Sequence, residues 1–231
     1  MKIRNHNFFN IKNGFTLAEV LITLVVIGVV AALTIPTAIN NTKDQEFKSQ
    51  FAKAYSTLSQ AMYKTIMYDF YGYVDCAYRY DAQNNTIDYS IGTPRSQCPA
   101  FYEAFAKNLN VQKICRGNSK ADGCVPAYKS YNSGSCGGFS QNGVDNINYS
   151  YVLADGQIIN TYGAADMPLF LIDINGHKGP NAYGKDLFSF NISRRTDDVS
   201  TYFLGTQACG FPVSGGKTTE NMIQYALAGK K

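Results

Sequence analysis

A long apolar run near the N-terminus constrains this 231-residue chain most strongly. Between Phe15 and Thr42 the only charged side chain is Glu19, whereas the residues before Phe15 carry three cations and no acid. A helix over residues 15–39 would be about 37 Å long, enough to cross a hydrocarbon core of about 30 Å with some tilt. The sequence therefore predicts a basic segment at residues 1–14 and then a membrane-spanning helix.

Glu19 is the unusual member of this run. A carboxylate inside a membrane helix costs about 2.5–3.5 kcal/mol on insertion scales, so such a residue usually has a partner. The sequence around Glu19 offers no such partner nearby. We therefore expect the environment of Glu19 to be important for function.

The stretch GFTLAE at residues 14–19, followed by an apolar helix with Pro36 near its end, resembles the class III leader of type IV pilins and type II secretion pseudopilins. In that family a membrane-embedded aspartyl peptidase cuts after the glycine and methylates the new N-terminal residue. The resemblance implies cleavage between Gly14 and Phe15. It also implies that Glu19 meets the N-terminal amine of a neighbouring subunit during filament assembly. It covers residues 14–67.

An ordinary secretory signal is the alternative interpretation of the same segment. It would have a basic n-region, an h-region at residues 20–33 and cleavage after a small residue such as Ala32 or Ala38. Such a signal needs no carboxylate at the start of its apolar run. It also does not explain why a further helical pattern follows immediately, so we favour the pilin-type leader.

That further pattern covers residues 40–68. Apolar residues such as Phe47, Phe51 and Leu58 recur at steps of three and four, with lysines and serines between them, which predicts an amphipathic helix ending near residue 67. We expect Pro36 to kink the long helix or to melt it near residues 32–36, because proline lacks an amide donor.

The remaining segment, residues 69–231, is predicted to be an exported head. Residues 73–143 are rich in turn-forming residues and suggest only a short helix at residues 99–109. After residue 147 the pattern indicates strands, with a hairpin at Asp155-Gly156 and further strands at residues 168–174, 187–192 and 200–204. We expect an α+β fold in which a four- or five-stranded antiparallel sheet packs on the amphipathic helix, followed by a loose C-terminal tail.

Six cysteines all follow the apolar run, and an even number on the exported side predicts disulfides, although reduced structural thiols remain an alternative. None of them has the C-x-x-C spacing, and a single histidine follows the leader, which argues against a zinc or thioredoxin-type site. The candidates for disulfide bonds are Cys76, Cys98, Cys115, Cys124, Cys136 and Cys209.

The segment at residues 173–186, here called the oxygen-rich loop, is a candidate calcium site. Its candidate ligands are Asp173, Asn175, Asn181 and Asp186, and calcium favours six to eight oxygen ligands from carboxylates, amides and carbonyls. Gly184 stands where an EF-hand needs a bidentate Glu, so an EF-hand is excluded. Major secretion pseudopilins are similar in carrying a calcium loop in their C-terminal sheet. A turn-rich connection, in which Asp and Asn bond their own backbone, is the alternative.

Charge adds little evidence for a nucleic-acid partner. Of the 21 Lys and Arg residues, three lie in the leader, which leaves 18 against 17 Asp and Glu. Because positive residues stay on the cytoplasmic side, the leader charges predict a single-pass protein of the inner membrane with its C-terminal part exported.

We therefore expect a structural subunit and no enzyme. By resemblance its partners are the prepilin peptidase and methyltransferase, other pilin or pseudopilin subunits, the inner-membrane assembly machinery and membrane lipid. Two alternatives remain: a minor pilin or adhesin-like tip subunit that binds a ligand, and a secreted enzyme or binding domain released by ordinary signal peptidase. His177 lies in the oxygen-rich loop, but no Gly-x-Ser-x-Gly motif accompanies it.

Overall fold

The computed structural model describes residues 14–88, 97–129, 140–161, 167–198, 200–206, 209–210 and 212–228. By their internal contacts the residues fall into two compact units, residues 1–45 and residues 46–231. The first unit contains the start of the long helix, and the second is the head. The predictions for residues 1–13 and for Cys136 concern residues outside those that the structure describes.

Helix α1, Leu17–Lys64, runs through both units and is followed by one wider helical turn, Thr65–Asp69. The helix continues without a break through Pro36, so the melting predicted at residues 32–36 is wrong. Proline removes a single donor from the hydrogen-bond ladder of the helix, and that loss does not interrupt a helix of 48 residues. The kink predicted at Pro36 stays a prediction.

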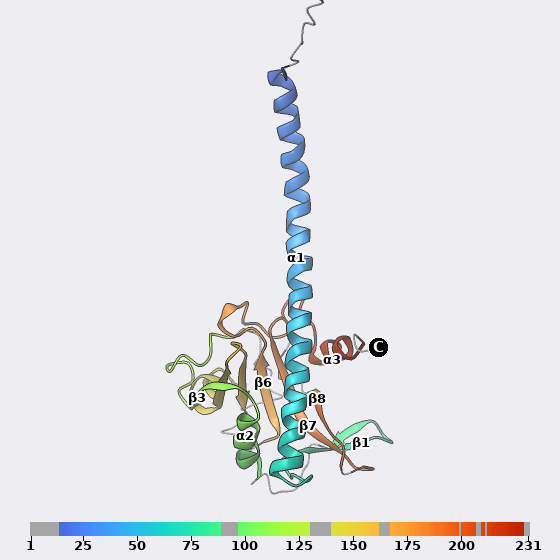
Figure 1. Cartoon of the computed structure of the whole chain (residues 1–231), viewed down its shortest axis with the longest axis vertical. Coiled ribbons are helices and arrows are strands. Elements are labelled where there is room, and N and C mark those ends of the chain that lie inside the picture. The colour runs from blue at the N-terminus through green and yellow to red at the C-terminus, as the bar shows by residue number, and fades with distance from the viewer. Residues whose placement is uncertain are drawn as a thin grey trace, which may run out of the picture. The chain divides into compact units, whose positions relative to one another are not determined.

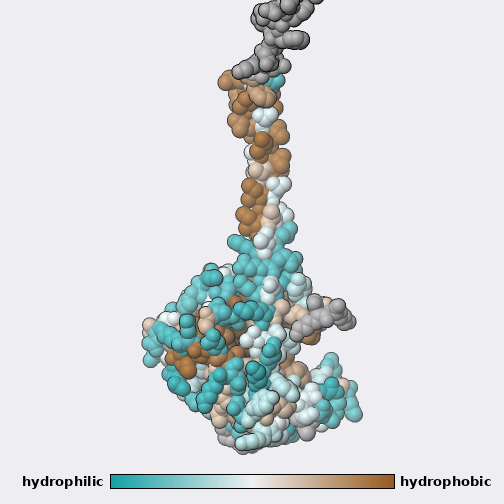
Figure 2. Space-filling view, in the orientation of Figure 1, coloured by the Kyte–Doolittle hydropathy of each residue, from teal (hydrophilic) through white to brown (hydrophobic). Residues whose placement is uncertain are grey.

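The α1 segment in the first unit has large apolar side chains around its whole circumference. Val20, Ile27 and Leu33 are 44, 64 and 73% exposed, and Figure 2 shows the apolar residues along this part of the helix. Among the described residues, α1 with its terminal turn is the one helix long and apolar enough to cross a membrane. A helix that is apolar all round belongs in lipid or in a protein core.

The head is built on one eight-stranded sheet (Figure 1). Its order is β2-β1-β7-β6-β5-β4-β3, and β8 pairs with the opposite edge of β7. All pairs are antiparallel except β1 with β7, which run parallel. The strands are β1 Tyr78–Asp81, β2 Thr86–Asp88, β3 Val111–Arg116, β4 Tyr149–Leu153, β5 Ile158–Thr161, β6 Leu169–Asp173, β7 Leu187–Arg195 and β8 Tyr202–Thr206.

Side chains of the central strands alternate between two hydrophobic cores, one on each face of the sheet. Three helices cover one of these faces. Phe170, Phe188 and Phe190 lie in a core with residues from the second half of α1, from α2 (Cys98–Lys107) and from α3 (Thr219–Ala228). Leu171 and Leu187 belong to the other core, which includes Cys115 and Cys124. Both faces are therefore covered, which explains why every residue of β6 is buried.

The α+β class and the long helix on a largely antiparallel sheet are confirmed, but two details of the prediction are wrong. The sheet has eight strands, because β1, β2 and β3 lie in the segment predicted to be irregular. The C-terminal tail contains α3, which buries Met222 and Ala226. Of these short elements, β1, β3 and α3 depend on contacts with distant parts of the chain, whereas β2 pairs with its neighbour β1.

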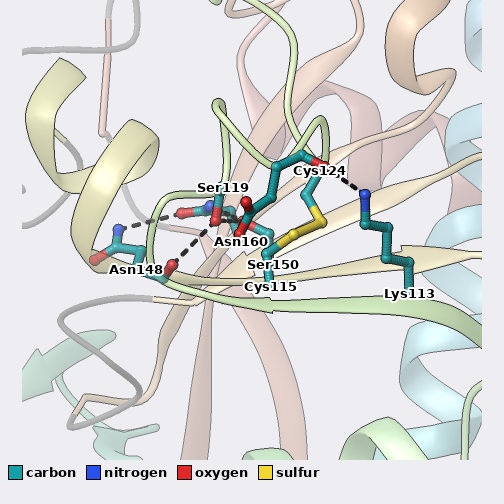
Figure 3. The surroundings of a disulfide bond; sticks show 8 residues. Lys113, Cys115, Ser119, Cys124, Asn148, Ser150 and Asn160 are labelled. Carbon is teal, nitrogen blue, oxygen red and sulfur yellow. Dashed lines mark hydrogen bonds between the residues drawn. A yellow bond between two sulfur atoms is a disulfide. The ribbon is translucent and has the colours of Figure 1, made fainter.

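Disulfides fasten two loops of the head, as predicted. Cys76 bonds Cys98, and Cys115 bonds Cys124. Cys209 is also disulfide-bonded. Close to the Cys115–Cys124 disulfide, hydrogen bonds form a ring of four buried polar residues from β4, β5 and the neighbouring loops (Figure 3). Its members are Ser119, Asn148, Ser150 and Asn160.

Candidate functional site

The start of α1 carries a reciprocal cap between Thr16 and Glu19. The Thr16 amide and the Thr16 hydroxyl each donate to Glu19 Oε2 at 2.8 Å, and the Glu19 amide donates to Thr16 Oγ1 at 3.2 Å. Thr16 precedes the first helical residue and Glu19 is the third, which is the capping-box arrangement. The cap satisfies backbone donors that the first turn of a helix leaves free.

The expectation that the sequence near Glu19 offers no partner is therefore wrong. The Thr-x-x-Glu spacing before an apolar run is itself a capping-box signature, and it could have identified Thr16 from the sequence. Both bonds to the carboxylate use Oε2, so within the described part of the chain the other oxygen is available for a further donor. Phe15, the residue just before the cap, is 88% exposed.

The exposed Gly14–Phe15 bond and the capped carboxylate thus lie within six residues. An exposed bond before a helix is open to a peptidase. A carboxylate with one oxygen available can accept a hydrogen bond from an ammonium group, and such charge-assisted bonds are about twice as strong as neutral ones. The geometry therefore suits a processing site and a contact for a positively charged group.

The oxygen-rich loop connects β6 to β7 and is the second candidate site. Asp173 and Asp186 flank the loop, and both are fully buried. Asp173 Oδ1 accepts the amides of Asn175 and Gly176 at 3.1 and 2.7 Å. The Asp186 carboxylate accepts hydrogen bonds from the Asn181 and Ala182 amides, both at 2.8 Å. The two carboxylates therefore hold the backbone of the loop through hydrogen bonds to its amides.

Three buried oxygens of this loop accept no hydrogen bond in the described part of the chain: Asp173 Oδ2, Asn175 Oδ1 and Asn181 Oδ1. A buried acceptor without a donor costs about 1–3 kcal/mol. Backbone amides in the turns of the loop donate to the other oxygens of the two carboxylates. The alternative of a simple turn-rich connection therefore explains those oxygens but not these three. They belong to three of the four residues that the sequence indicates as calcium ligands.

The electrostatics of the loop are unfavourable for two bare carboxylates. Burial, together with the neighbouring Asp186 carboxylate, raises the pKa of Asp173 to about 8, although hydrogen bonds from the amides of Asn175 and Gly176 and from the Tyr128 side chain oppose this shift. Burial also raises the pKa of Asp186. A bound cation is often the largest local charge in such a site and lowers the pKa of its ligands.

The other candidate residues give no comparable arrangement. His177 is exposed at the surface of the oxygen-rich loop. In the described ranges no group of three or more His, Cys, Asp or Glu side chains could hold a metal ion. Any cation in the oxygen-rich loop would therefore depend on amide and backbone oxygens in addition to two carboxylates, as hard cations such as calcium accept.

Comparison with protein families matches the prokaryotic N-terminal methylation motif over residues 10–35. The matched segment includes Gly14, Phe15 and Glu19 and ends one residue before Pro36. Comparison with curated proteins and with solved structures gave no match. The comparisons therefore bear on the leader and on the start of α1.

Proposed function

Because the chain carries the leader and N-terminal methylation motif of the type IV pilin and pseudopilin family, we propose that it is a filament subunit made as a precursor. The precursor is cut between Gly14 and Phe15 and methylated at Phe15. The mature chain then assembles into a type IV pilus or a type II secretion pseudopilus. The observation that carries the proposal is the methylation motif placed directly on the capped start of a long apolar helix.

The proposal divides the chain by task. Residues 1–14 are the cleaved leader, and residues 15–39 cross the membrane and later form part of the filament core. Residues 40–68 continue the helix into the head, where Phe51 and Leu58 are buried. Residues 69–231 complete the exported head. The family is structural, and the chain acts by assembling.

Glu19 performs two tasks in this proposal. In the membrane the Thr16 cap supplies donors to the carboxylate, which lowers the cost of holding a charge in lipid. In the filament the second carboxylate oxygen accepts the methylated amine of a neighbouring Phe15. Pairing two charges in an apolar core requires good geometry and further hydrogen bonds, and the Thr16 hydroxyl provides one of these bonds.

The partners follow from this sequence of events. A prepilin peptidase and methyltransferase processes the N-terminus, and the inner-membrane assembly machinery extracts the subunit from lipid. Copies of this chain or related subunits then pack around the helix. Before assembly the protein resides in the inner membrane with its head on the outer side.

Processing is tested by intact mass and N-terminal sequencing of the membrane-extracted protein. We expect a chain that begins at Phe15 and is one methyl group heavier than its sequence. Gly14→Leu should leave the uncut precursor in the membrane. A mature chain that begins near Leu33 or Ile39 would identify an ordinary signal peptide and refute the proposal.

Assembly is tested with variants that are exported and cleaved normally. Glu19→Ala should be processed but should enter sheared filaments at least tenfold less than the wild type. Thr23→Val is the matched control, because Thr23 is on the same helix and its hydroxyl only bonds the Val20 carbonyl. Normal filament incorporation of Glu19→Ala would remove the assembly role of this carboxylate. Scarcity of the wild-type chain in filaments would favour the minor tip subunit.

A specific observation favours a second role, the binding of a calcium ion by the oxygen-rich loop. The buried oxygens without donors belong to Asp173, Asn175 and Asn181, and Asp186 would add a second carboxylate. A cation there would supply positive charge to two buried carboxylates and would satisfy the free oxygens. Exported calcium modules bind with dissociation constants of about 10⁻⁴–10⁻³ M.

Thermal unfolding of the detergent-solubilised mature chain tests this role. Calcium at ten times its dissociation constant should stabilise the head by about 1.4 kcal/mol, or about 3–6 °C in melting temperature. Asp173→Asn should abolish the shift. Asp155→Asn should keep it, because Asp155 is at the surface in an ion pair with Lys53 at 2.9 Å. An equal melting temperature in calcium and in EDTA would exclude the site.

A further inference from the structure

Strand β3 forms an open edge of the sheet. Among the described strands it pairs with β4 alone, so the backbone amides and carbonyls on its other side have no strand partner in the part of the chain that the structure describes. A bulge between Val111 and Lys113 leaves residues 113–116 as the regular stretch of this edge. An exposed edge of this kind can accept an extended segment as an additional strand.

Contacts on one face of β3 hold the strand in place. Cys115 is buried in the same core as Cys124 and is bonded to it, and the Lys113 ammonium donates to the Asp122 carbonyl. Figure 3 shows Lys113 and Cys115 on the same side of the strand. A strand that is already fixed loses little freedom when a second strand pairs with it, which favours binding.

The opposite face of β3 lies beside α2 (Figure 1), and a groove of about 370 Å³ separates the two elements. We call this space the α2–β3 groove. Its apolar lining includes Ala106 and Leu109 from α2 and the turn after it, and Val111 and Ile114 from β3. The Ile114 side chain is 42% exposed, so part of this apolar lining is uncovered. An edge strand with an apolar pocket beside it is the arrangement that binds an extended peptide through backbone pairing and side-chain burial.

The charged residues of the α2–β3 groove favour an acidic ligand. Its lining contains two cations, Lys107 and Arg116, and one carboxylate, Glu103. The Arg116 guanidinium lies 3.1 Å from the Glu103 carboxylate, and both side chains are more than half exposed. In the ranges that the structure describes, the Lys107 ammonium forms no ion pair. Because exposed ion pairs contribute little, a carboxylate of a ligand can replace Glu103 at Arg116 or bind Lys107.

We propose that the α2–β3 groove binds an extended segment of a partner protein in which an apolar residue and an acidic residue are two positions apart. The segment pairs with residues 113–116 as an additional strand. Ile114 and Arg116 are two positions apart on β3 and line the same groove, and residues opposite one another on paired strands are in contact. The apolar side chain of the segment therefore covers Ile114, and the acidic side chain meets Arg116.

A second copy of this chain fits the groove less well through its other terminal strands. In β2 the apolar residue and the acid, Ile87 and Asp88, are adjacent, so their side chains point to opposite faces of the sheet. Strand β8 contains no acidic residue. The spacing of Ile114 and Arg116 thus favours a segment from another protein, and this inference goes beyond the proposed role in filament assembly.

Binding of labelled peptides to the full mature chain in detergent, followed by fluorescence anisotropy, tests the proposal. The probe is Thr-Ser-Thr-Leu-Thr-Asp-Thr, with its leucine and aspartate two positions apart. We expect it to bind about tenfold more tightly than Thr-Ser-Thr-Leu-Asp-Thr-Thr, in which the two residues are adjacent, and than Thr-Ser-Thr-Leu-Thr-Lys-Thr, in which the charge is reversed. Equal affinity for the three peptides, or no saturable binding at about 1 mM, would overturn the proposal.

Backbone pairing is tested with two versions of the probe, each N-methylated at alternate residues in one of the two possible phases. Alternate amides of a strand face its neighbour, so one version should bind like the probe and the other should lose binding. Unchanged affinity of both versions would refute the pairing with β3.

Variants of the chain locate the site. Ile114→Ser and Arg116→Glu should each weaken binding of the probe about tenfold, and Arg116→Glu should bind the lysine peptide more tightly than the wild type does. The matched controls Ile147→Ser and Arg79→Glu should bind like the wild type, because Ile147 is 51% exposed and Arg79 is an exposed residue of β1. Equal losses in the variants and in their controls would refute the location.

Self-association identifies the other possible occupant. If the wild-type head associates with itself, and if this association is lost in Ile114→Ser and prevents binding of the probe, a second copy occupies the groove and the partner segment is refuted. Incorporation of Ile114→Ser into sheared filaments is measured alongside. Normal incorporation with lost peptide binding supports a site that is separate from assembly, and failure of the peptide experiments leaves the proposed filament role intact.

Discussion

Replacing Phe51 by Ala should release the second half of α1 from the head. Phe51 is 1% exposed, and its ring centre lies 4.8 Å from that of Phe188, edge to face, and 5.9 Å from that of Phe190. Removing a buried phenylalanine costs about 3–5 kcal/mol, because apolar burial is lost and a cavity remains. Edge-to-face pairs are worth about 0.5–1.5 kcal/mol beyond their area, so we expect the upper part of that range.

The assay is denaturant and thermal unfolding of the oxidised mature chain in detergent, followed by circular dichroism. For a domain the size of the head, each kcal/mol lowers the melting temperature by about 2–4 °C, so a loss of about 4–5 kcal/mol in Phe51→Ala should lower it by about 8–20 °C. Tyr63→Ala is the control on the same helix, because Tyr63 is 60% exposed, and surface substitutions cost about 0.5 kcal/mol or less. A loss below about 1 kcal/mol for Phe51→Ala would show that the aromatic contacts do not hold α1 on the sheet.

Three further measurements concern the head. Replacing Cys76 and Cys98 by Ser, 22 residues apart, should cost about 3 kcal/mol from the restored freedom of the unfolded loop, seen as a lower urea midpoint. Tyr71→Asn should add about 0.5–1 kcal/mol, because Tyr71 has a φ of 51° and Asn tolerates this conformation better. Hydrogen bonds from Asn84 hold the pKa of Asp81 below its usual value of 3.8; its stabilisation is therefore present above about pH 4 and lost as the pH falls, and Asp81→Asn should flatten that acid limb of a pH titration of stability.

The sequence predicts the elements whose signal is local. The apolar run and the three- and four-residue spacing of Phe47, Phe51 and Leu58 indicate α1, since helix periodicity repeats many times over its length. Asp155-Gly156 correctly indicates the hairpin of β4 and β5, but the predicted two-residue turn is wrong. The connection has three residues, 154–156, because the Leu153 amide donates to the Gln157 carbonyl at 2.8 Å and the Gly156 amide donates to the Leu153 carbonyl at 2.9 Å.

Most of the elements that were missed depend on contacts distant in the chain, and β2, which pairs with β1 across a short turn, is the exception. Strand β1 pairs with β7, so that Tyr78 lies opposite Ser193, and its four residues carry little pattern of their own. Helix α3 follows a glycine-rich segment that suggests a loose tail. The spacing of Met222, Ile223 and Ala226 does indicate a helix, but its stability comes from the core that it shares with β7 and α1.

The candidate sites likewise combine features that the local sequence indicates with features that arise only from the folded structure. The Asp and Asn spacing in the oxygen-rich loop identifies possible ligands, but the burial of Asp173 and the lack of donors for Asn175 and Asn181 arise from the packing of the fold. Conversely, the Thr16 cap of Glu19 is a local feature that the sequence does contain. The lack of a basic residue near Glu19 does not mean that its carboxylate has no partner, because hydroxyl and amide donors also stabilise a carboxylate.

The packing of α3 determines where this protein can carry a label. Because the ring of Tyr225 lies beside Lys48 of α1, a fluorescent protein fused after α3 would be placed next to this part of α1, and its bulk would compete with any partner that packs there. The turn at residues 82–85 between β1 and β2 is largely exposed, and its strands lie at the edge of the sheet. A short epitope or a single reactive cysteine introduced in that turn is therefore the better choice for imaging filaments while they grow.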